Sequence, residues 1–246
     1  MNNDRTARLT EFLNRVDRDR SHPNLRPKDA ATMILIDRAE ATPKVLLGRR
    51  HQGHKFLPGK FVFPGGRVEP SDRRVGVTNP LHPHVEELLL RGVRYPSAEK
   101  ARAFALAAIR ETFEETGLLL GVRRTDTAAN APWPRFAQAQ IVPDLAQVHF
   151  IARAVTPPKR PRRFDTRFFA VDAEMIAARV DGIVGPDAEL VELVWIPITE
   201  AKRLDLPPIT VAVLEELQDR AAAGFGHDLP VPFYKWIGKG FRRYVI

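Results

Sequence analysis

A short acidic segment, RETFEETGL at residues 110–118, gathers three carboxylates and one arginine immediately before a glycine. On a helix that turns by about 100° per residue, the side chains of Glu111, Glu114 and Glu115 share roughly one third of the circumference. Like charges this close repel one another by roughly a few tenths of a kcal/mol per pair. Arg110 relieves part of this repulsion by pairing with Glu114, and a divalent cation would relieve the rest. Mg²⁺ and Mn²⁺ prefer such carboxylate oxygens, although a solvated, glutamate-rich helix surface fits the same pattern.

The helix that carries these carboxylates is expected to run from about Ser97 to Thr116. Ser97 is a suitable N-cap, because its hydroxyl can accept a hydrogen bond from the first turn. Gly117 is a suitable residue to end the helix in a left-handed conformation. Nearly opposite the carboxylates the helix presents three apolar side chains, Leu106, Ile109 and Phe113. The helix therefore buries one face and concentrates negative charge on the other.

The other elements mix strands and helices without regular alternation. Short apolar runs predict strands at residues 31–38, 44–50, 61–66, 146–155, 165–171 and 189–198. Helical periodicity predicts an N-terminal helix at about 5–20 and a C-terminal helical extension at about 199–246. This order favours a single α+β domain over residues 1–246, with a mixed β-sheet packed between helices, rather than a doubly wound sheet.

Residues 73–102 differ in character from the segments around them. They contain three prolines, at positions 80, 83 and 96, and one short amphipathic piece, VEELLLRG. This composition predicts an insertion that holds one helix.

Composition limits the chemistry and the partners. The chain has 246 residues and no cysteine, which excludes disulfides, zinc–thiolate sites and thiol catalysis. A formal net charge of +8 favours anionic partners such as nucleotides and phosphorylated cofactors. The densest basic cluster, PPKRPRRFDTR at 157–167, fits a solvated loop or a phosphate-binding segment equally well. The polar start of the chain and the lack of an apolar run near ~18 residues predict a cytoplasmic protein without a membrane segment.

RETFEETGL also resembles the second half of the Nudix box, G-x5-E-x7-R-E-U-x-E-E-x-G-U, in which U is a bulky aliphatic residue. Thr112 departs from the pattern at one aliphatic position. The start of the box is similar to FPGGRVEPSD, with Gly66 as its glycine and Asp72 where glutamate is usual. About 30 residues are inserted between the two halves, close to the segment 73–102. Such a split box resembles the branch of Nudix hydrolases similar to the peroxisomal coenzyme A diphosphatases.

The resemblance implies a Nudix fold and hydrolysis of a nucleoside diphosphate linked to another group, with Mg²⁺ or Mn²⁺ as cofactor. The implied metal ligands are the Gly66 carbonyl and three carboxylates, Glu111, Glu114 and Glu115. Arg110 would orient Glu111 or Glu114 through a charged hydrogen bond. The split-box branch implies coenzyme A or an acyl-CoA as substrate, cleaved to 3′,5′-ADP and (acyl-)phosphopantetheine.

Further site residues are expected outside the box. In this family the general base often lies on a later loop or strand, and Glu189 and Glu192 are the candidates before Trp195. Exposed structural carboxylates are the alternative for both. Arg49 and Arg50 follow a predicted strand, and one of them would face the diphosphate if the strands pair as expected.

Arg163 and Arg167 lie in the basic cluster, on either side of Phe164 and Asp165. They are candidates to bind the 3′-phosphoadenosine end of coenzyme A. Alternatively, Asp165 pairs with an arginine and fixes a turn.

Other functions fit parts of the same pattern. ADP-ribose, NADH or a nucleotide sugar are alternative substrates of a Nudix hydrolase, and a non-catalytic Nudix nucleotide sensor is a second class. Sensors usually lose one of the box glutamates, whereas all three are present here. A basic nucleic-acid-binding domain is a third possibility, although we expect a small-molecule nucleoside diphosphate derivative as the partner. The basic, aromatic C-terminus could close over a ligand or form a homodimer contact.

Overall fold

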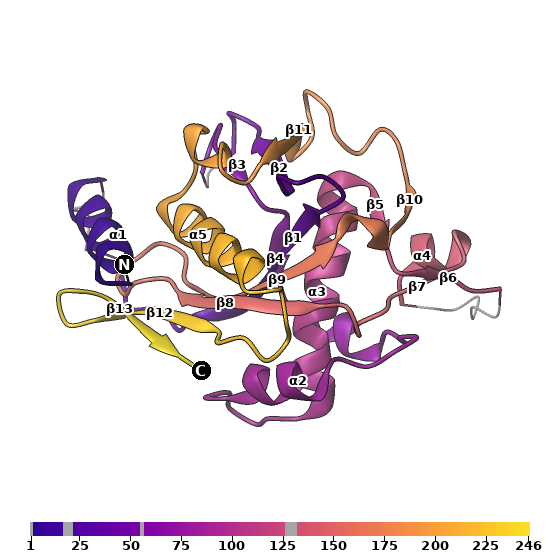
Figure 1. The fold of residues 1–246 in the computed structure, drawn as a ribbon, viewed down its shortest axis with the longest axis horizontal. Helices are drawn as coiled ribbons and strands as arrows, with labels where there is room; N and C mark the ends of the chain where they lie inside the picture. Colours follow the sequence, from indigo (N-terminus) through magenta and orange to yellow (C-terminus); the bar gives the residue numbers. More distant parts are fainter. Residues whose placement is uncertain (1, 17–21, 55–56, 126–131) are drawn as a thin grey trace.

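The computed structural model describes residues 2–16, 22–54, 57–125 and 132–246 (Figure 1). The α-helices in these ranges are α1 (Asn2–Val16), α2 (Pro83–Leu90), α3 (Ala98–Thr116), α4 (Pro134–Gln138) and α5 (Pro208–Ala222). The same ranges also contain three 3₁₀ turns, η1 (Pro70–Arg74), η2 (Ala173–Met175) and η3 (Ala201–Arg203). In the part of the chain that the structure describes, no helix is both long and apolar enough to cross a membrane.

A nine-stranded mixed sheet forms the centre of the molecule. Its order is β11 (Leu190–Pro197), β2 (Lys44–Arg50), β1 (Lys28–Asp37), β9 (Phe164–Asp172), β8 (His149–Val155), β12 (Pro232–Ile237) and β13 (Gly240–Val245). The short strands β3 (Phe61–Val62) and β4 (Gly65–Arg67) pair with β2 and β1. The pairs β1–β9 and β8–β12 are parallel, whereas the other pairs of this sheet are antiparallel. Two small ladders join β10 (Ile176–Arg179) to β5 (Leu118–Leu120), and β6 (Val122–Arg123) to β7 (Ile141–Val142).

The sheet lies between two helical layers, so the prediction of an α+β fold with a mixed sheet between helices is confirmed. Side chains of β1 alternate between the layers because successive residues of a strand point to opposite faces. Met33 and Leu35 pack in the core beside α3, and Ile34 and Ile36 pack in the core beside α5. We call these the α3 face and the α5 face of the sheet.

Helix α3 begins and ends where its capping residues predict. The Ser97 hydroxyl accepts a hydrogen bond from the Lys100 backbone N–H at 3.2 Å. Gly117 ends the helix with φ +76°, and a Cβ at this position would overlap with the Val180 carbonyl. A left-handed, crowded position of this kind requires glycine. The predicted helix from Ser97 to Thr116 is therefore confirmed.

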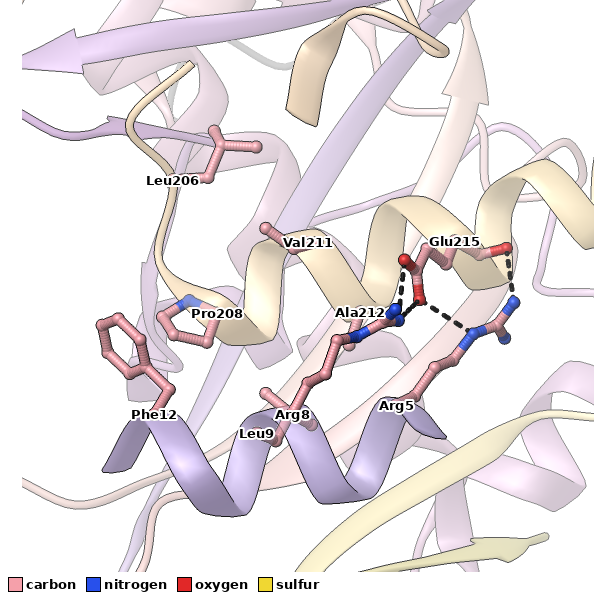
Figure 2. A pocket seen from close by; sticks show the side chains of 9 residues that line it. All are labelled: Arg5, Arg8, Leu9, Phe12, Leu206, Pro208, Val211, Ala212 and Glu215. Atoms are coloured by element: carbon pink, nitrogen blue, oxygen red, sulfur yellow. Dashed lines mark hydrogen bonds and ion pairs between the residues drawn. The ribbon is translucent and has the colours of Figure 1, made fainter. Parts of the chain in front are cut away.

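Helix α1 packs beside α5 at the edge of a pocket of about 210 Å³ (Figure 2). Arg5 Nε and Arg8 Nη2 lie 3.0 and 2.7 Å from Glu215 Oε2. Leu9 is buried in the α5-side core below them. The predicted N-terminal helix is thus present up to Val16, and the rest of its expected range lies outside the described residues.

The predicted C-terminal helical extension is wrong beyond α5. Residues 199–206 contain only the short turn η3, and the chain after α5 forms the hairpin β12–β13. This hairpin joins the main sheet through parallel pairing of Phe233 with Arg153 and Tyr234 with Ala154. Aromatic and β-branched residues favour a strand here, but the decisive pairing with β8 is a contact between distant segments.

The segments before α3 also differ in detail from their predictions. The strand expected at 61–66 is divided into β3 and β4 around Pro64, which has no N–H to donate to a sheet. The expected insertion 73–102 holds one helix, α2, as predicted. Its last residues, 98–102, belong to the first turns of α3.

Three histidine rings stack where α2, β8 and the C-terminal segment meet. The rings of His149 and His227 lie 4.0 Å apart, and those of His227 and His82 lie 4.6 Å apart. His149 Nδ1 is buried without a hydrogen-bond partner among the described residues. Burial, followed by the charges of His227, Arg220 and Arg38, lowers the pKa of His149 to about 3, while Asp172 opposes the shift.

We expect acid to destabilise the fold through His149. Its pKa of about 3 lies below the ordinary value of 6.5, so the unfolded chain binds an extra proton between these two values. The stability that neutral His149 contributes is complete above pH 6.5 and decreases as the pH falls toward 3. Between pH 6.5 and 5 the loss should be roughly 1–2 kcal/mol. His149→Gln should flatten this part of the pH profile of the unfolding free energy, measured by urea denaturation. His84→Gln is the control, and a His149→Gln profile as steep as that of the wild type would contradict the prediction.

Candidate active site

The carboxylates of α3 face the turn between β3 and β4. Glu115 is 6% exposed, and its Oε2 accepts a hydrogen bond from the Gly65 backbone N–H at 3.1 Å. The Glu111 carboxylate lies against Gly66, where any Cβ would overlap with it. The two glycines therefore let the backbone approach the carboxylates more closely than other residues would.

Arg110 joins both halves of the acidic motif. Its Nη1 donates to Glu111 Oε1 at 2.9 Å and to Glu114 Oε2 at 3.0 Å. Its Nε and Nη2 donate to the Asp72 carboxylate at 2.9 and 3.2 Å, and Nη2 also donates to the Arg67 carbonyl at 2.8 Å. Burial acts to lower the pKa of Arg110, but the hydrogen bonds and charges of these carboxylates outweigh it and raise the pKa. The guanidinium is therefore a fixed cation.

Asp72 anchors Arg110 from the far side of the insertion. Its side chain is fully buried, and Oδ2 also accepts a hydrogen bond from the Glu69 backbone N–H at 2.8 Å. That second bond belongs to a reciprocal cap at the start of η1. Asp72 thus holds the position of Arg110 and the start of η1 together, although 37 residues separate it from Arg110 in the chain.

Negative charge in the site is only partly balanced. Burial raises the pKa of Glu115 well above its usual range, and the charges of Glu189 and Glu111 raise it further, against the Gly65 N–H and Arg50. Burial also raises the pKa of Glu111, although Arg110 opposes the shift. A cation bound between these carboxylates would offset the cost of their desolvation and reduce the repulsion between them.

The residues present fit a hard divalent cation in their chemistry. Glu111 and Glu115 offer carboxylate oxygens, which Mg²⁺ and Mn²⁺ prefer, and Gly66 leaves space beside Glu111. Arg110 Nη1 holds both Glu111 and Glu114. The described residues contain no group of three or more His, Asp or Glu already arranged around a common metal position.

The two predicted arginines of β2 and the two candidate general bases lie on different faces of the sheet. Arg50 shares the α3 face with Leu46, and its Nη2 lies 2.9 Å from Glu189 Oε1. Arg49 shares the α5 face with Leu47, and its Nε lies 2.8 Å from Glu192 Oε2. Arg50 and Glu189 are therefore brought to Glu111 and Glu115, whereas Arg49 and Glu192 are on the other side.

Arg163 and Arg167 have structural contacts. Arg163 Nη1 donates to Asn24 Oδ1 at 2.7 Å and to the Leu25 carbonyl at 2.5 Å. Arg167 is only 1% exposed and lies 3.9 Å over the Phe104 ring. The guanidinium of Arg167 is therefore not accessible to a substrate in this conformation.

Asp165 instead pairs with arginines, as one of the two sequence interpretations predicts. Its Oδ2 lies 2.6 Å from Arg153 Nη2, and its Oδ1 lies 3.5 Å from Arg167 Nη1. Sequence reasoning missed Arg153, which comes from β8, because its pairing with Asp165 depends on the register of β8 and β9. It also missed the Gly65 N–H as a donor to Glu115, although the adjacent glycines of FPGG were a signal of close backbone approach.

Comparison with known proteins agrees with this geometry. A Nudix hydrolase of solved structure from Alicyclobacillus acidocaldarius is 31% identical to this chain and has a TM-score of 0.55. The match covers 77% of this chain and 90% of that protein. The chain therefore belongs to the Nudix hydrolase family. No family model matches it.

Two curated relatives are similar over a smaller share of their length. Nudix hydrolase 7 of Caenorhabditis elegans is 28% identical over 208 residues, with 77% of this chain covered. The human acyl-coenzyme A diphosphatase NUDT19 is 28% identical over 240 residues, with 74% of this chain covered. The chain spans 60% and 62% of the length of these relatives.

Gly66→Ala should weaken the binding of Mn²⁺ by about tenfold or more, since a new methyl group displaces the Glu111 carboxylate and disturbed ligand positions typically cost this much. The loss of stability should not exceed the contribution of the hydrogen bond from Arg110 to Glu111, about 1.5–3 kcal/mol. Isothermal titration calorimetry with MnCl₂ measures the first effect and thermal unfolding the second. Gly76→Ala is the matched control, since no atom lies within 4 Å of its new methyl group. Equal Mn²⁺ affinity in both variants would refute this role of Gly66.

Asp72→Asn should destabilise the protein by about 3 kcal/mol, because it leaves the buried Arg110 guanidinium without its main counter-charge. Urea denaturation measures the change in the free energy of unfolding. Asp205→Asn removes a carboxylate that pairs with Lys60 but is 71% exposed, and it should cost about 0–1 kcal/mol. Similar losses in the two variants would show that Asp72 is not the anchor described here.

Proposed function

We propose that this Nudix family member is a Mg²⁺- or Mn²⁺-dependent pyrophosphohydrolase. It would cleave the diphosphate bond of a nucleoside diphosphate joined to another group. The observation that carries the proposal is the pair of buried Glu115 and half-buried Glu111, which faces Gly65, Gly66 and Glu189 with incomplete charge compensation. Such a concentration of raised pKa values is typical of functional sites.

The cation would be held by Glu111, Glu115 and the Gly66 carbonyl, with Glu114 joining them if it leaves Arg110. When bound, it supplies positive charge against the diphosphate and makes water a stronger nucleophile at neutral pH. Asp72 and Arg110 keep Glu111 in place for this role.

Glu189 is the proposed general base. Its carboxylate would take a proton from water as the water oxygen attacks phosphorus, and the bond to the leaving phosphate oxygen would break with the electron pair on that oxygen. Arg50 holds Glu189 at 2.9 Å and remains a candidate contact for the diphosphate. Arg49 and Glu192 lie on the other face of the sheet, so we leave them out of the reacting centre.

Coenzyme A or an acyl-CoA is the proposed substrate, with 3′,5′-ADP and (acyl-)phosphopantetheine as products. The similarity to the human acyl-coenzyme A diphosphatase and the net charge of +8 support it. ADP-ribose, NADH and nucleotide sugars are the alternative substrates. The cytoplasmic location and the homodimer expected from the sequence stay predictions.

A non-catalytic nucleotide sensor is the second candidate function. The presence of all three box glutamates, with Arg110 bound to two of them, favours catalysis.

The deciding experiment is product analysis with Mg²⁺ or Mn²⁺ on coenzyme A, acetyl-CoA, ADP-ribose, NADH and diadenosine polyphosphates. The wild type should cleave at least one compound, and Glu115→Gln should reduce kcat by about 100-fold or more, because it removes a charge from the reacting centre. Glu40→Gln, an exposed carboxylate paired with Lys44, is the control and should retain activity. Nucleotide binding without cleavage of any compound would support the sensor, and full activity of Glu115→Gln would place the chemistry elsewhere.

A further inference from the structure

A tight turn follows β2 and lies beside the proposed general base. The turn comprises residues 51–54, HQGH. The His54 backbone N–H donates to the His51 carbonyl at 3.2 Å, and His51 Nδ1 accepts a hydrogen bond from the Gly53 N–H at 2.9 Å. The His51 backbone N–H donates to the Glu189 carbonyl at 3.0 Å. The turn is therefore closed by its own hydrogen bonds and is joined to the backbone of Glu189.

The side chain of His54 contacts Arg50 from this turn. Arg50 Nη2 lies 3.4 Å from His54 Nδ1, and the same nitrogen lies 2.9 Å from Glu189 Oε1. A guanidinium donates hydrogen bonds and accepts none, so the His54 nitrogen that faces it is the acceptor and the ring proton is on Nε2. Because Nη2 carries two hydrogens, it can donate one to the imidazole and one to the carboxylate.

Arg50 connects the turn with the carboxylates of α3. Its side chain is 12% exposed, whereas that of Glu189 is 44% exposed. Burial is the main cause of the raised pKa of Glu115, the charge of Glu189 raises it further, and the charge of Arg50 opposes the shift. The Arg50–Glu189 pair therefore lies close enough to the carboxylates of α3 to influence their charge.

Glu189 depends on Arg50 for its position. In the ranges that the structure describes, the ion pair with Arg50 is the one polar contact of the Glu189 side chain. A glutamate has several staggered rotamers, and a single ion pair at the surface restrains them only weakly. A second contact that holds the guanidinium in place makes the pair more rigid, and His54 supplies that contact.

We propose that His54 is a positioning residue for the hydrolysis: its imidazole keeps Arg50 on Glu189, and Arg50 keeps the Glu189 carboxylate directed at the attacking water. This inference rests on the proposed function. The diphosphate of a bound substrate offers Arg50 a second anionic partner. If Arg50 moves onto the phosphate, Glu189 loses its restraint and is less often placed to take the proton. His54 acts through Arg50 and not on the substrate.

Kinetic constants test this role on the compound of the product-analysis panel that the wild type cleaves fastest. His54→Ala should lower kcat by about tenfold or more, because small displacements of a catalytic group have effects of this size. KM should rise by less than about threefold, since substrate binding keeps its contacts. His54→Asn retains an acceptor near the position of Nδ1 and should restore most of kcat. His84→Ala removes an exposed histidine near Glu87 and should leave both constants unchanged.

A double-variant cycle separates positioning of the base from a general effect on the fold. Glu189→Gln removes the proposed base, so the position of this side chain no longer matters for proton transfer. Adding His54→Ala to Glu189→Gln should then change kcat by less than about twofold, because the two residues act as one unit. Additive losses would show that His54 acts independently of Glu189 and would overturn the proposal, as would wild-type kcat in His54→Ala or no recovery in His54→Asn.

A spectroscopic measurement distinguishes failure of this inference from failure of the proposed function. In ¹⁵N NMR spectra recorded above neutral pH, His54 Nδ1 should have the chemical shift of an unprotonated ring nitrogen. Arg50→Met should change that shift, because it removes the donor and keeps an apolar side chain. A wild type that cleaves substrate but shows no such change would overturn the inference alone. A wild type that cleaves no compound, with the contact intact, would overturn the hydrolase assignment and with it the role of His54 in hydrolysis.

Discussion

The buried pair between Arg110 and Asp72 is the interaction on which the rest of the site depends. One guanidinium contacts two α3 carboxylates, the β4 backbone and the aspartate at η1. Three segments, α3, β4 and η1, therefore share one set of short, charge-assisted hydrogen bonds, which are stronger than neutral ones. The positive charge of Arg110 also holds the Glu111 carboxylate near Glu115 against the repulsion between the two. The repulsion that remains between these two glutamates favours the proposed binding of a cation between them.

The parts of the fold that the sequence predicted well are those set by local chemistry. The caps at Ser97 and Gly117 act within a few residues, so the bounds of α3 could be inferred without knowledge of the remainder. The hairpin β12–β13 could not, because its place in the sheet depends on pairing with β8, which is about 80 residues earlier in the chain. Residues such as PFYKWI carry strand propensity, but propensity does not name the partner strand.

The site likewise combines features that the local sequence determines with features that depend on the pairing of distant segments. The spacing of the α3 carboxylates put them on one face, which helical periodicity alone determines. The placement of Arg50 and Arg49 on opposite faces of the sheet follows from the register of β2. The placement of Glu189 and Glu192 on opposite faces also depends on the bulge in β11 between Leu190 and Glu192. The burial of Arg167 could not be predicted from the sequence either, because the residues that contact it, Phe104 and Asp29, belong to α3 and β1. Long-range register, rather than composition, decides which charged residues meet a substrate.

The split motif has a consequence for how the chain tolerates change. The segment that must close between Asp72 and Arg110 is between four and five times longer than in the uninterrupted pattern. The entropy lost on closing a loop increases only with the logarithm of the loop length. The longer segment therefore disfavours folding by about 1.4 kcal/mol. Helix α2 packs against α3 and recovers such a loss through its buried leucines, Leu88 and Leu89. The length of the segment between the two halves can therefore drift during evolution while the geometry of the carboxylates stays constant, which makes this loop a natural position for new substrate-facing structure.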